Sequence, residues 1–494
     1  MPIDFFDSSI FYLGPDDWKN LSPFILLFAG IAVLVVAASM RAKDLVLRTL
    51  SFSFLSGAAV LFFASLLSQG RFFLGSSMEL GPMERIVAGG ICLIAALSSL
   101  YVRGPDYARH SEWGALLLIC VLGMCLLPTA RNWVAFFVYL EVLSIPAYLL
   151  SALYSNREKS LEASMKYLMM GAFVSCFFLL GISLFFAVSG SFKFEAISVA
   201  MTAAAGPQQF LCFTAVALVF SSLAFKVSLF PFHFWAADVY QGAPAPIASF
   251  LAGATKLSVF SSIVLAFSEC GLWDIPGVSL YVKLLGVLSV VLGAVMALTQ
   301  SRLRRMLAYS GVVNAGFVAL VLPNGLSVLP SVIGFLLVYA LSVLICFAVH
   351  EIALLRLGRS MDDDLEINSF VELKSKLSPF YLVLLGFALL SLAGIPPLPG
   401  FFTKYVLLSV LAKNSAFLLL AVALIGTFLG LGFYLRSLVP MALYPAIDSK
   451  KTNSETSSSG ASLTAIAATV FSLLVLFGFT YLQGLISSAE LMAR

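Results

Sequence analysis

The sequence predicts an all-α integral membrane protein of about fourteen transmembrane helices, with two inverted five-helix repeats and breaks in helices seven and twelve. Of its 494 residues, 61% are hydrophobic and 11% are charged, which is far more apolar than the composition of soluble domains. The apolar runs are unbroken over about 20 residues, whereas the strands of membrane barrels alternate in polarity over about ten. Prolines interrupt two of these runs, and this predicts the two breaks.

The apolar runs define the predicted helices in chain order. The first seven lie near 22–40, 46–68, 86–101, 113–130, 132–153, 161–188 and 209–230. The next seven lie near 246–268, 278–299, 303–322, 329–357, 378–412, 415–439 and 462–486. Each run is long enough to cross a bilayer as a helix, and the prolines fall beside the seventh run and inside the twelfth.

The order of the helices divides the chain into four parts. The N-terminal region, 1–110, holds three helices, and the first repeat, helices four to eight, covers 111–268. The second repeat, helices nine to thirteen, covers 277–443, and a Ser/Thr-rich linker with the last helix covers 444–494. Two five-helix units of similar size are inverted relative to each other because five is odd.

Basic residues set the predicted orientation. They gather in "MRAKDLVLR", "SNREKSLEASMK", "SRLRR" and "DSKK", which lie on one side if the helices alternate, and this side is predicted to be cytoplasmic. Both termini then lie on the non-cytoplasmic side of a bacterial-type inner (plasma) membrane. An acidic segment precedes the first apolar run, so no cleavable signal peptide is expected. The net charge of +4 follows from this asymmetry and does not indicate nucleic-acid binding.

Cysteine spacing argues against a metal or iron–sulfur site in this chain. The seven cysteines are scattered and form no C-x-x-C pair. We therefore expect no cofactor and no metal here.

Four charged residues lie deep inside predicted helices. These are Glu141, Lys226, Lys256 and Lys404. A charge at the bilayer centre costs about 2.5 to 3.5 kcal/mol on insertion scales, so these residues need compensation or a function. For the lysines the alternative is snorkelling toward the headgroups, and for Glu141 it is a structural ion pair or a protonated, hydrogen-bonded acid.

Other polar residues near the breaks and in helix eleven have weaker interpretations. His233 either shapes the broken segment "KVSLFPFHFWAADVY" or relays protons. Asp238 is interpreted as a cap or turn residue. His350 and Glu351 are adjacent, point about 100° apart on a helix and are possible relay residues.

A proton path accounts for the buried charges together. A lysine that is buried without a counter-charge loses its proton more readily than one beside a carboxylate. Glu141 and Lys226 would form a switchable pair, Lys256 a central relay, and Lys404 a gate beside the second break, "LAGIPPLPGFFTKYV".

Three stretches carry a family resemblance: "FPFHFWAADVYQGAPAPIASFLAGATKLSVF", "SRLRRMLAYSGVVNAGFVAL" and "LAGIPPLPGFFTKYVLL". They resemble the antiporter-like membrane subunits of respiratory complex I, NADH-quinone oxidoreductase, and among these the N type more than the M and L types. The resemblance covers about 110–440 and implies proton translocation through Glu141, Lys226, Lys256 and Lys404, driven by electron transfer in other subunits. NADH, FMN, iron–sulfur clusters and quinone are then expected in partner subunits of the membrane-embedded hetero-oligomer.

The chain also departs from this family. Asn314 stands where a histidine is common, so it cannot carry a proton as an imidazole would. Two other functions remain open. One is a subunit of a cation/proton antiporter, which would favour more membrane carboxylates than Glu141 alone, and the other is a structural membrane subunit without transport of its own.

Overall fold

The computed structural model describes residues 15–67, 70–75, 77–102, 111–153, 158–204, 206–357, 364–367 and 377–443. Within these ranges the chain is almost entirely helical, in agreement with the predicted fold class. The exception is a short antiparallel hairpin, β1 (Phe72–Leu74) and β2 (Met78–Leu80), which the sequence analysis did not predict.

The N-terminal half contains continuous helices at the predicted apolar runs. They are α1 (Pro15–Ser39), α2 (Asp44–Ala64), α3 (Pro82–Leu100), α5 (Trp113–Leu126), α6 (Trp133–Ser151) and α7 (Glu158–Ser189). Short 3-10 turns, η2 (Ser65–Leu67) and η3 (Leu127–Thr129), extend α2 and α5. A short helix that was not predicted, α8 (Phe194–Ala203), follows α7.

The seventh predicted helix is broken. α9 (Pro207–Lys226) ends earlier than the predicted 230, and α10 (Phe234–Gly242) resumes after a non-helical segment that contains Pro231. The eighth is continuous but wound differently along its length. It consists of α11 (Ala245–Phe250), a π-helical turn η4 (Leu251–Thr255) and α12 (Lys256–Glu269).

The described part of the C-terminal half is also helical. A short turn, η5 (Leu272–Asp274), leads into α13 (Val278–Thr299), α14 (Leu303–Val321), η6 (Leu322–Val328) and α15 (Leu329–Leu357). The twelfth predicted helix is broken into α17 (Pro379–Ala393) and α18 (Pro399–Lys413), and α19 (Phe417–Leu443) is the thirteenth. The predicted fourteenth helix and its linker lie outside the described residues.

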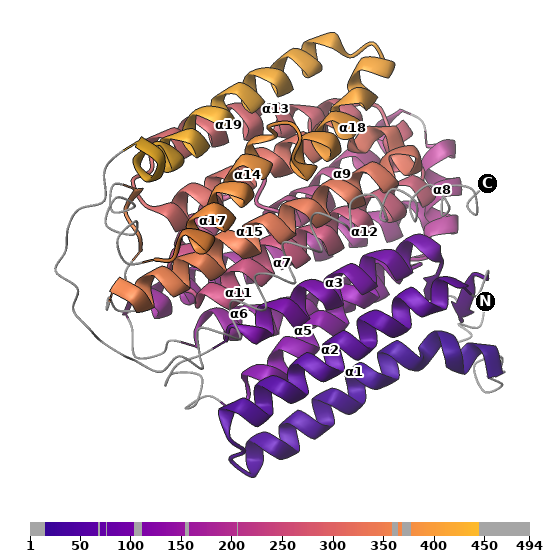
Figure 1. Cartoon of the computed structure of the whole chain (residues 1–494). Coiled ribbons are helices and arrows are strands. Elements are labelled where there is room, and N and C mark those ends of the chain that lie inside the picture. The colour runs from indigo at the N-terminus through magenta and orange to yellow at the C-terminus, as the bar shows by residue number, and fades with distance from the viewer. Residues whose placement is uncertain are drawn as a thin grey trace.

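The helices form one bundle, in which the indigo α1 and α2 lie at one edge and the gold α19 at the other (Figure 1). α15 passes through the middle and packs on α3, α11, α12, α17 and α18. Within the described ranges, ten helices are long and apolar enough to cross a membrane. The segment Ala245–Glu269 is buried along its whole apolar window, whereas only 33% of the windows of α1 and α2 and 28% of that of α19 are buried. The protein is therefore an integral membrane protein whose centre lies around α12 and α15.

Candidate functional site

Lys226 lies where α9 ends at the first break. Its side chain is buried, with 2% of the residue exposed. Its Nζ donates to Ser144 Oγ at 2.6 Å and to Tyr148 Oη at 2.8 Å, both on α6, and lies over the Tyr148 ring. Ser144 Oγ in turn donates to the Leu140 carbonyl. The ammonium is thus held by two hydroxyl oxygens.

Glu141 does not contact Lys226, so the predicted ion pair between them is absent from the structure. Glu141 is partly exposed and accepts a 2.6 Å hydrogen bond from Ser175 Oγ of α7. It lies three residues before Ser144 on α6, and the side chain that meets Lys226 is the serine. Residue spacing on α6 places the carboxylate about one turn from the lysine's partner, and the two groups are linked through α6 and not by direct contact.

Lys256 begins α12 directly after the π-helical turn and is 1% exposed. Its Nζ donates to the Gly311 carbonyl of α14 at 2.6 Å and lies 3.4 Å from Tyr339 Oη of α15. A Cβ at position 311 would lie 2.6 Å from Nζ, so a glycine is needed for this approach. The lysine therefore bridges α12, α14 and α15 near the centre of the bundle.

Lys404 lies on α18 beside the second break and is 7% exposed. Its Nζ donates to the carbonyl of Leu392 at 3.1 Å and lies 3.5 Å from that of Ala393, at the C-terminal end of α17. The last carbonyls of a helix have no intrahelical donor and carry partial negative charge, which suits an ammonium. The ring of Phe317 lies under the same nitrogen.

A small cavity joins the surroundings of Lys404 to those of Lys256. Its lining includes Tyr339, which contacts Lys256, and Lys404 itself. The volume open to the centre of a water molecule is ≈ 10 Å³, which is about the space that one water needs. Its other polar lining residues are Asn314, Ser342, Ser391 and Thr403. Asn314, the residue that departs from the family pattern, thus lines the same cavity as Lys404.

None of the three buried lysines is ion-paired with a carboxylate in the described part of the chain. Their partners are hydroxyl and carbonyl oxygens. Snorkelling is inconsistent with this geometry, because each ammonium points into the protein and bonds to a neighbouring helix. Groups of this kind can bind and release a proton without breaking a salt bridge.

The histidines take separate places. His233 occupies the position just before α10 without a capping hydrogen bond from its side chain, is 3% exposed, and packs its ring against Phe230 and Phe234. This contact favours the interpretation in which it shapes the break. His350 is buried on α15, and its Nε2 lies 3.2 Å from Asp364 Oδ1 and accepts from the Leu365 N–H. Glu351 follows it on α15 and is also buried.

Asp238 has a different role from the predicted cap or turn. It lies within α10 and forms ion pairs with Lys166 at 3.1 Å and Arg305 at 3.0 Å. The prediction was wrong because the partners come from α7 and α14, which are far from Asp238 in sequence.

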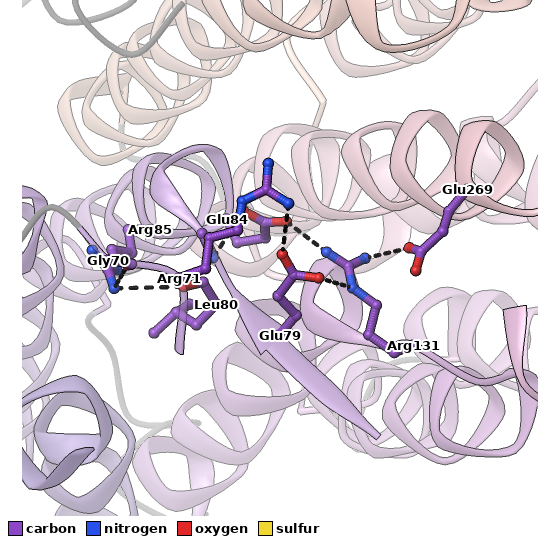
Figure 2. A network of polar contacts seen from close by, with 9 residues as sticks. Gly70, Arg71, Glu79, Leu80, Glu84, Arg85, Arg131 and Glu269 are labelled. Carbon is purple, nitrogen blue, oxygen red and sulfur yellow. Dashed lines mark hydrogen bonds and ion pairs between the residues drawn. The ribbon is translucent and has the colours of Figure 1, made fainter. Parts of the chain in front are cut away.

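A second polar group, which we call the Arg131 cluster, was not found by the sequence analysis. Figure 2 shows Arg131 between Glu79 and Glu269, with Glu84 and Arg71 beside them. Arg131 Nε contacts Glu79 at 2.6 Å, Nη1 contacts Glu269 at 2.8 Å, and Nη2 contacts Glu84 at 3.3 Å. Arg71 binds the other oxygen of Glu79 at 3.1 Å. Arg131 precedes α6, and these carboxylates raise the pKa of its guanidinium against the opposing effect of burial.

No metal centre accompanies these groups in the described ranges, where no set of three His, Cys, Asp or Glu residues could hold an ion. The chemistry that the arrangement offers is proton binding on amines and carboxylates, with hydroxyls and room for a water between two of the lysines.

Comparison with known proteins gives one family match. Residues 130–430 match the family model described as NADH:quinone oxidoreductase/Mrp antiporter, transmembrane. This range runs from just before Arg131 into α19 and includes Glu141 and the three buried lysines.

Three solved structures share the fold along nearly the whole chain. A chain of respiratory complex I from Thermus thermophilus with bound aureothin is 28% identical, with a TM-score of 0.77, and the match covers 94% of this chain and 99% of that one. A chain of the membrane-bound sulfane sulfur reductase, an archaeal respiratory membrane complex, is 20% identical, with a TM-score of 0.79 and 97% of both chains covered. A chain of the Mrp complex from a Dietzia species is 19% identical, with a TM-score of 0.80 and 97% of both chains covered.

Proposed function

The chain belongs to the NADH:quinone oxidoreductase/Mrp antiporter transmembrane family, and from this premise we propose that it is a proton-translocating membrane-arm subunit of an NADH:quinone oxidoreductase, of the N type. Electron transfer would take place in partner subunits, which would hold NADH, FMN, iron–sulfur clusters and quinone. We place the assembly in a bacterial-type inner membrane, with both termini of this chain on the non-cytoplasmic side.

The main observation behind this proposal is that three lysines are buried without carboxylate partners in the described part of the chain. Lys226, Lys256 and Lys404 are each nine-tenths or more buried and donate to uncharged oxygens. A permanent charge at such depth costs several kcal/mol unless it is compensated, and the partial charges of hydroxyls and carbonyls compensate it less than a carboxylate would. Lysines in this setting are suited to carry protons, because the neutral amine and the ammonium are closer in free energy than they would be beside a carboxylate.

The roles of the residues follow from their positions. Lys226 would exchange its proton at the first break, and Glu141 would act on it through α6, whose Ser144 and Tyr148 hold the ammonium. Lys256 would be the central relay. From there Tyr339 and one water in the cavity would connect it to Lys404 at the second break.

A complex I subunit is favoured over a subunit of a cation/proton antiporter by two observations. The identity to the complex I chain, 28%, exceeds the 19% to the Mrp chain. The centre of the bundle is also lined by amines, hydroxyls and carbonyls, whereas binding of a metal cation calls for oxygen ligands such as carboxylates. The carboxylates of the Arg131 cluster are paired with arginines.

We expect this chain to co-purify with a large NADH-oxidising assembly. It presents little aqueous domain in which a nucleotide could bind, so the redox sites must come from other subunits. The measurement is affinity purification of the tagged chain at native abundance in a mild detergent, followed by mass spectrometry and an NADH oxidation assay. A purified chain that exchanges cations in vesicles without such partners would contradict the proposal and favour the antiporter.

Tyr148→Phe is expected to slow proton-coupled turnover about ten- to a hundredfold, because a hydrogen bond to a charged group contributes about 1.5 to 3 kcal/mol. The substitution removes one oxygen from Lys226 Nζ and keeps the ring beneath it. Tyr167→Phe is the matched control, since Tyr167 packs edge-on against Tyr148 and makes no contact with Lys226. Equal rates for the two variants in assembled complexes would remove Tyr148 from the proton path.

A further inference from the structure

The Arg131 cluster lies at the end of the bundle that the distribution of basic residues predicts to face away from the cytoplasm. α3 and α6 begin here and α12 ends here, so the cluster joins three helices and the β1–β2 hairpin (Figure 2). Most of it is buried, with side-chain exposures of 9% for Glu79, 6% for Glu84 and 13% for Arg131. The proton path described above does not use these residues.

The negative charges of the cluster gather around one guanidinium. Arg131 contacts all three carboxylates, from Glu79, Glu84 and Glu269, whereas Arg71 contacts Glu79 alone among them. Arg85 lies at the opposite end of the network from Glu269 and donates to backbone oxygens and to Asn20 (Figure 2). Three acids thus share one nearby cation, and a proton bound to one of them relieves the repulsion between their charges.

Contacts within the cluster select Glu269 as the carboxylate that takes this proton. Glu79 is held by both arginines, and Glu84 is held by Arg131 and by the backbone N–H of Gly81. Within the described ranges Glu269 has a single ion-pair partner, Arg131 Nη1. It is also the last residue of α12, where the helix dipole disfavours negative charge.

Glu269 can also exchange its proton with water. Its side chain is 30% exposed, several times more than those of Glu79 and Glu84. The charged and titratable groups that face it are Arg131, Glu79, Glu84, Glu195 of α8 and its neighbour Cys270. Arg131 is the only cation among them, and the other groups add negative charge or none.

Protonation of Glu269 would change what holds the helices together. Arg131 lies two residues before the start of α6, which carries the hydroxyls that hold Lys226. Glu269 ends the helix that Lys256 begins. The Arg131–Glu269 ion pair is thus a direct link between the outer ends of the two helices that position these lysines, and a proton on Glu269 weakens it.

We propose that the Arg131 cluster is a proton-binding site at the outer end of the bundle, in which Glu269 takes up and releases the proton. Its protonation state thereby sets the strength of the ion pair between Arg131 and the end of α12. The inference rests on the proposed function, since it treats α6 and α12 as the helices that position the proton-carrying lysines. Glu269 is a positioning residue in this scheme, because it acts on the lysines through Arg131 and the two helices.

The test uses the intact assembly in vesicles, with the pH varied on the outer side only and the inner side buffered. Glu269→Gln keeps the size of the side chain and an oxygen for Arg131 but cannot titrate. Turnover of this variant should lose its dependence on outer pH. Asp274→Asn removes an exposed acid five residues further on, with no contact to Arg131, and should keep the wild-type dependence.

A third variant, Glu84→Gln, separates a titrating role from a merely structural one. Removing a negative neighbour makes the ionised form of Glu269 less costly, so the midpoint of the dependence on outer pH should move down by about one unit. A structural contact would show no such shift. As a readout besides turnover, a water-soluble carbodiimide, which adds to protonated carboxyls, should label Glu269 more strongly as the pH falls, as located by mass spectrometry.

Three results would overturn the inference. Turnover of Glu269→Gln could keep the wild-type dependence on outer pH, or the midpoint of that dependence could stay unmoved in Glu84→Gln. Failure of Glu269→Gln to assemble would show that the role of Glu269 is structural. Lys256→Met separates failure of the proposed function from failure of the role assigned to Glu269. If Lys256→Met pumps normally, the proposed function fails, whereas if it stops pumping while Glu269→Gln behaves as wild type, only the role of Glu269 fails.

Discussion

Lys256→Met should lower proton pumping about a hundredfold or more, the range lost when a positioned proton-transfer group is removed. Methionine has a similar length and inserts more readily into an apolar core, so the bundle should still form. What disappears is the amine that connects the Gly311 carbonyl to Tyr339 and, through Tyr339, to the cavity beside Lys404. The measurement is acidification of vesicles by the purified assembly during NADH oxidation.

The matched control for this experiment is Lys283→Met on α13. Lys283 is partly exposed, and no interaction links it to the buried lysines in the described structure. Its loss should leave pumping unchanged. Normal pumping by an assembled Lys256→Met complex would remove Lys256 from the path, and a complex that does not assemble would show that its role is structural.

Lys404→Arg and Lys404→Met should both lower pumping strongly and to a similar extent. An arginine keeps the positive charge at the carbonyl end of α17 but does not release its proton in proteins, whereas methionine loses charge and proton together. If only a fixed charge were needed at the helix end, the arginine variant would retain activity. We expect a loss of about a hundredfold or more in each, because either change removes the titrating group.

Lys413→Met is the control on the same helix. Lys413 ends α18, is exposed, and lies nine residues beyond Lys404. Pumping should be unaffected by its loss. Activity in Lys404→Arg together with inactivity in Lys404→Met would contradict a proton-carrying role and support an electrostatic one.

The broken helices could be predicted from the sequence because proline acts locally. Pro231 and the prolines at 396, 397 and 399 remove backbone donors, and the structure is non-helical between α9 and α10 and between α17 and α18. The hairpin and α8 were missed because each is too short to produce a clear apolar run. The two inverted repeats remain a prediction.

The site was predicted less completely, because its contacts are between helices. Burial of Lys226, Lys256 and Lys404 follows from their depth in apolar runs, and the structure agrees. Their partners do not follow, since whether Glu141 or Ser144 meets Lys226 depends on how α6 is rotated about its axis. Roles for these residues in proton transfer remain a prediction.

The Arg131 cluster was missed for the same reason, because its residues are far apart in the sequence and meet only in the folded protein. Glu79, Arg131 and Glu269 are spread over nearly two hundred positions of the sequence, and each alone is ordinary for a residue beside an apolar run. Only packing of the β1–β2 hairpin with α6 and α12 brings them together. A sequence signal existed in principle, since Arg131 and Glu269 border apolar runs on the same predicted side of the membrane.

The number of protons moved per NADH oxidised tests the central claim most directly, that this chain carries protons through buried lysines. The comparison is between the wild-type assembly and one with Lys226→Met, Lys256→Met and Lys404→Met together, in vesicles of equal leakiness. The account predicts an assembled complex in which this ratio falls. An unchanged ratio at an unchanged rate would contradict it.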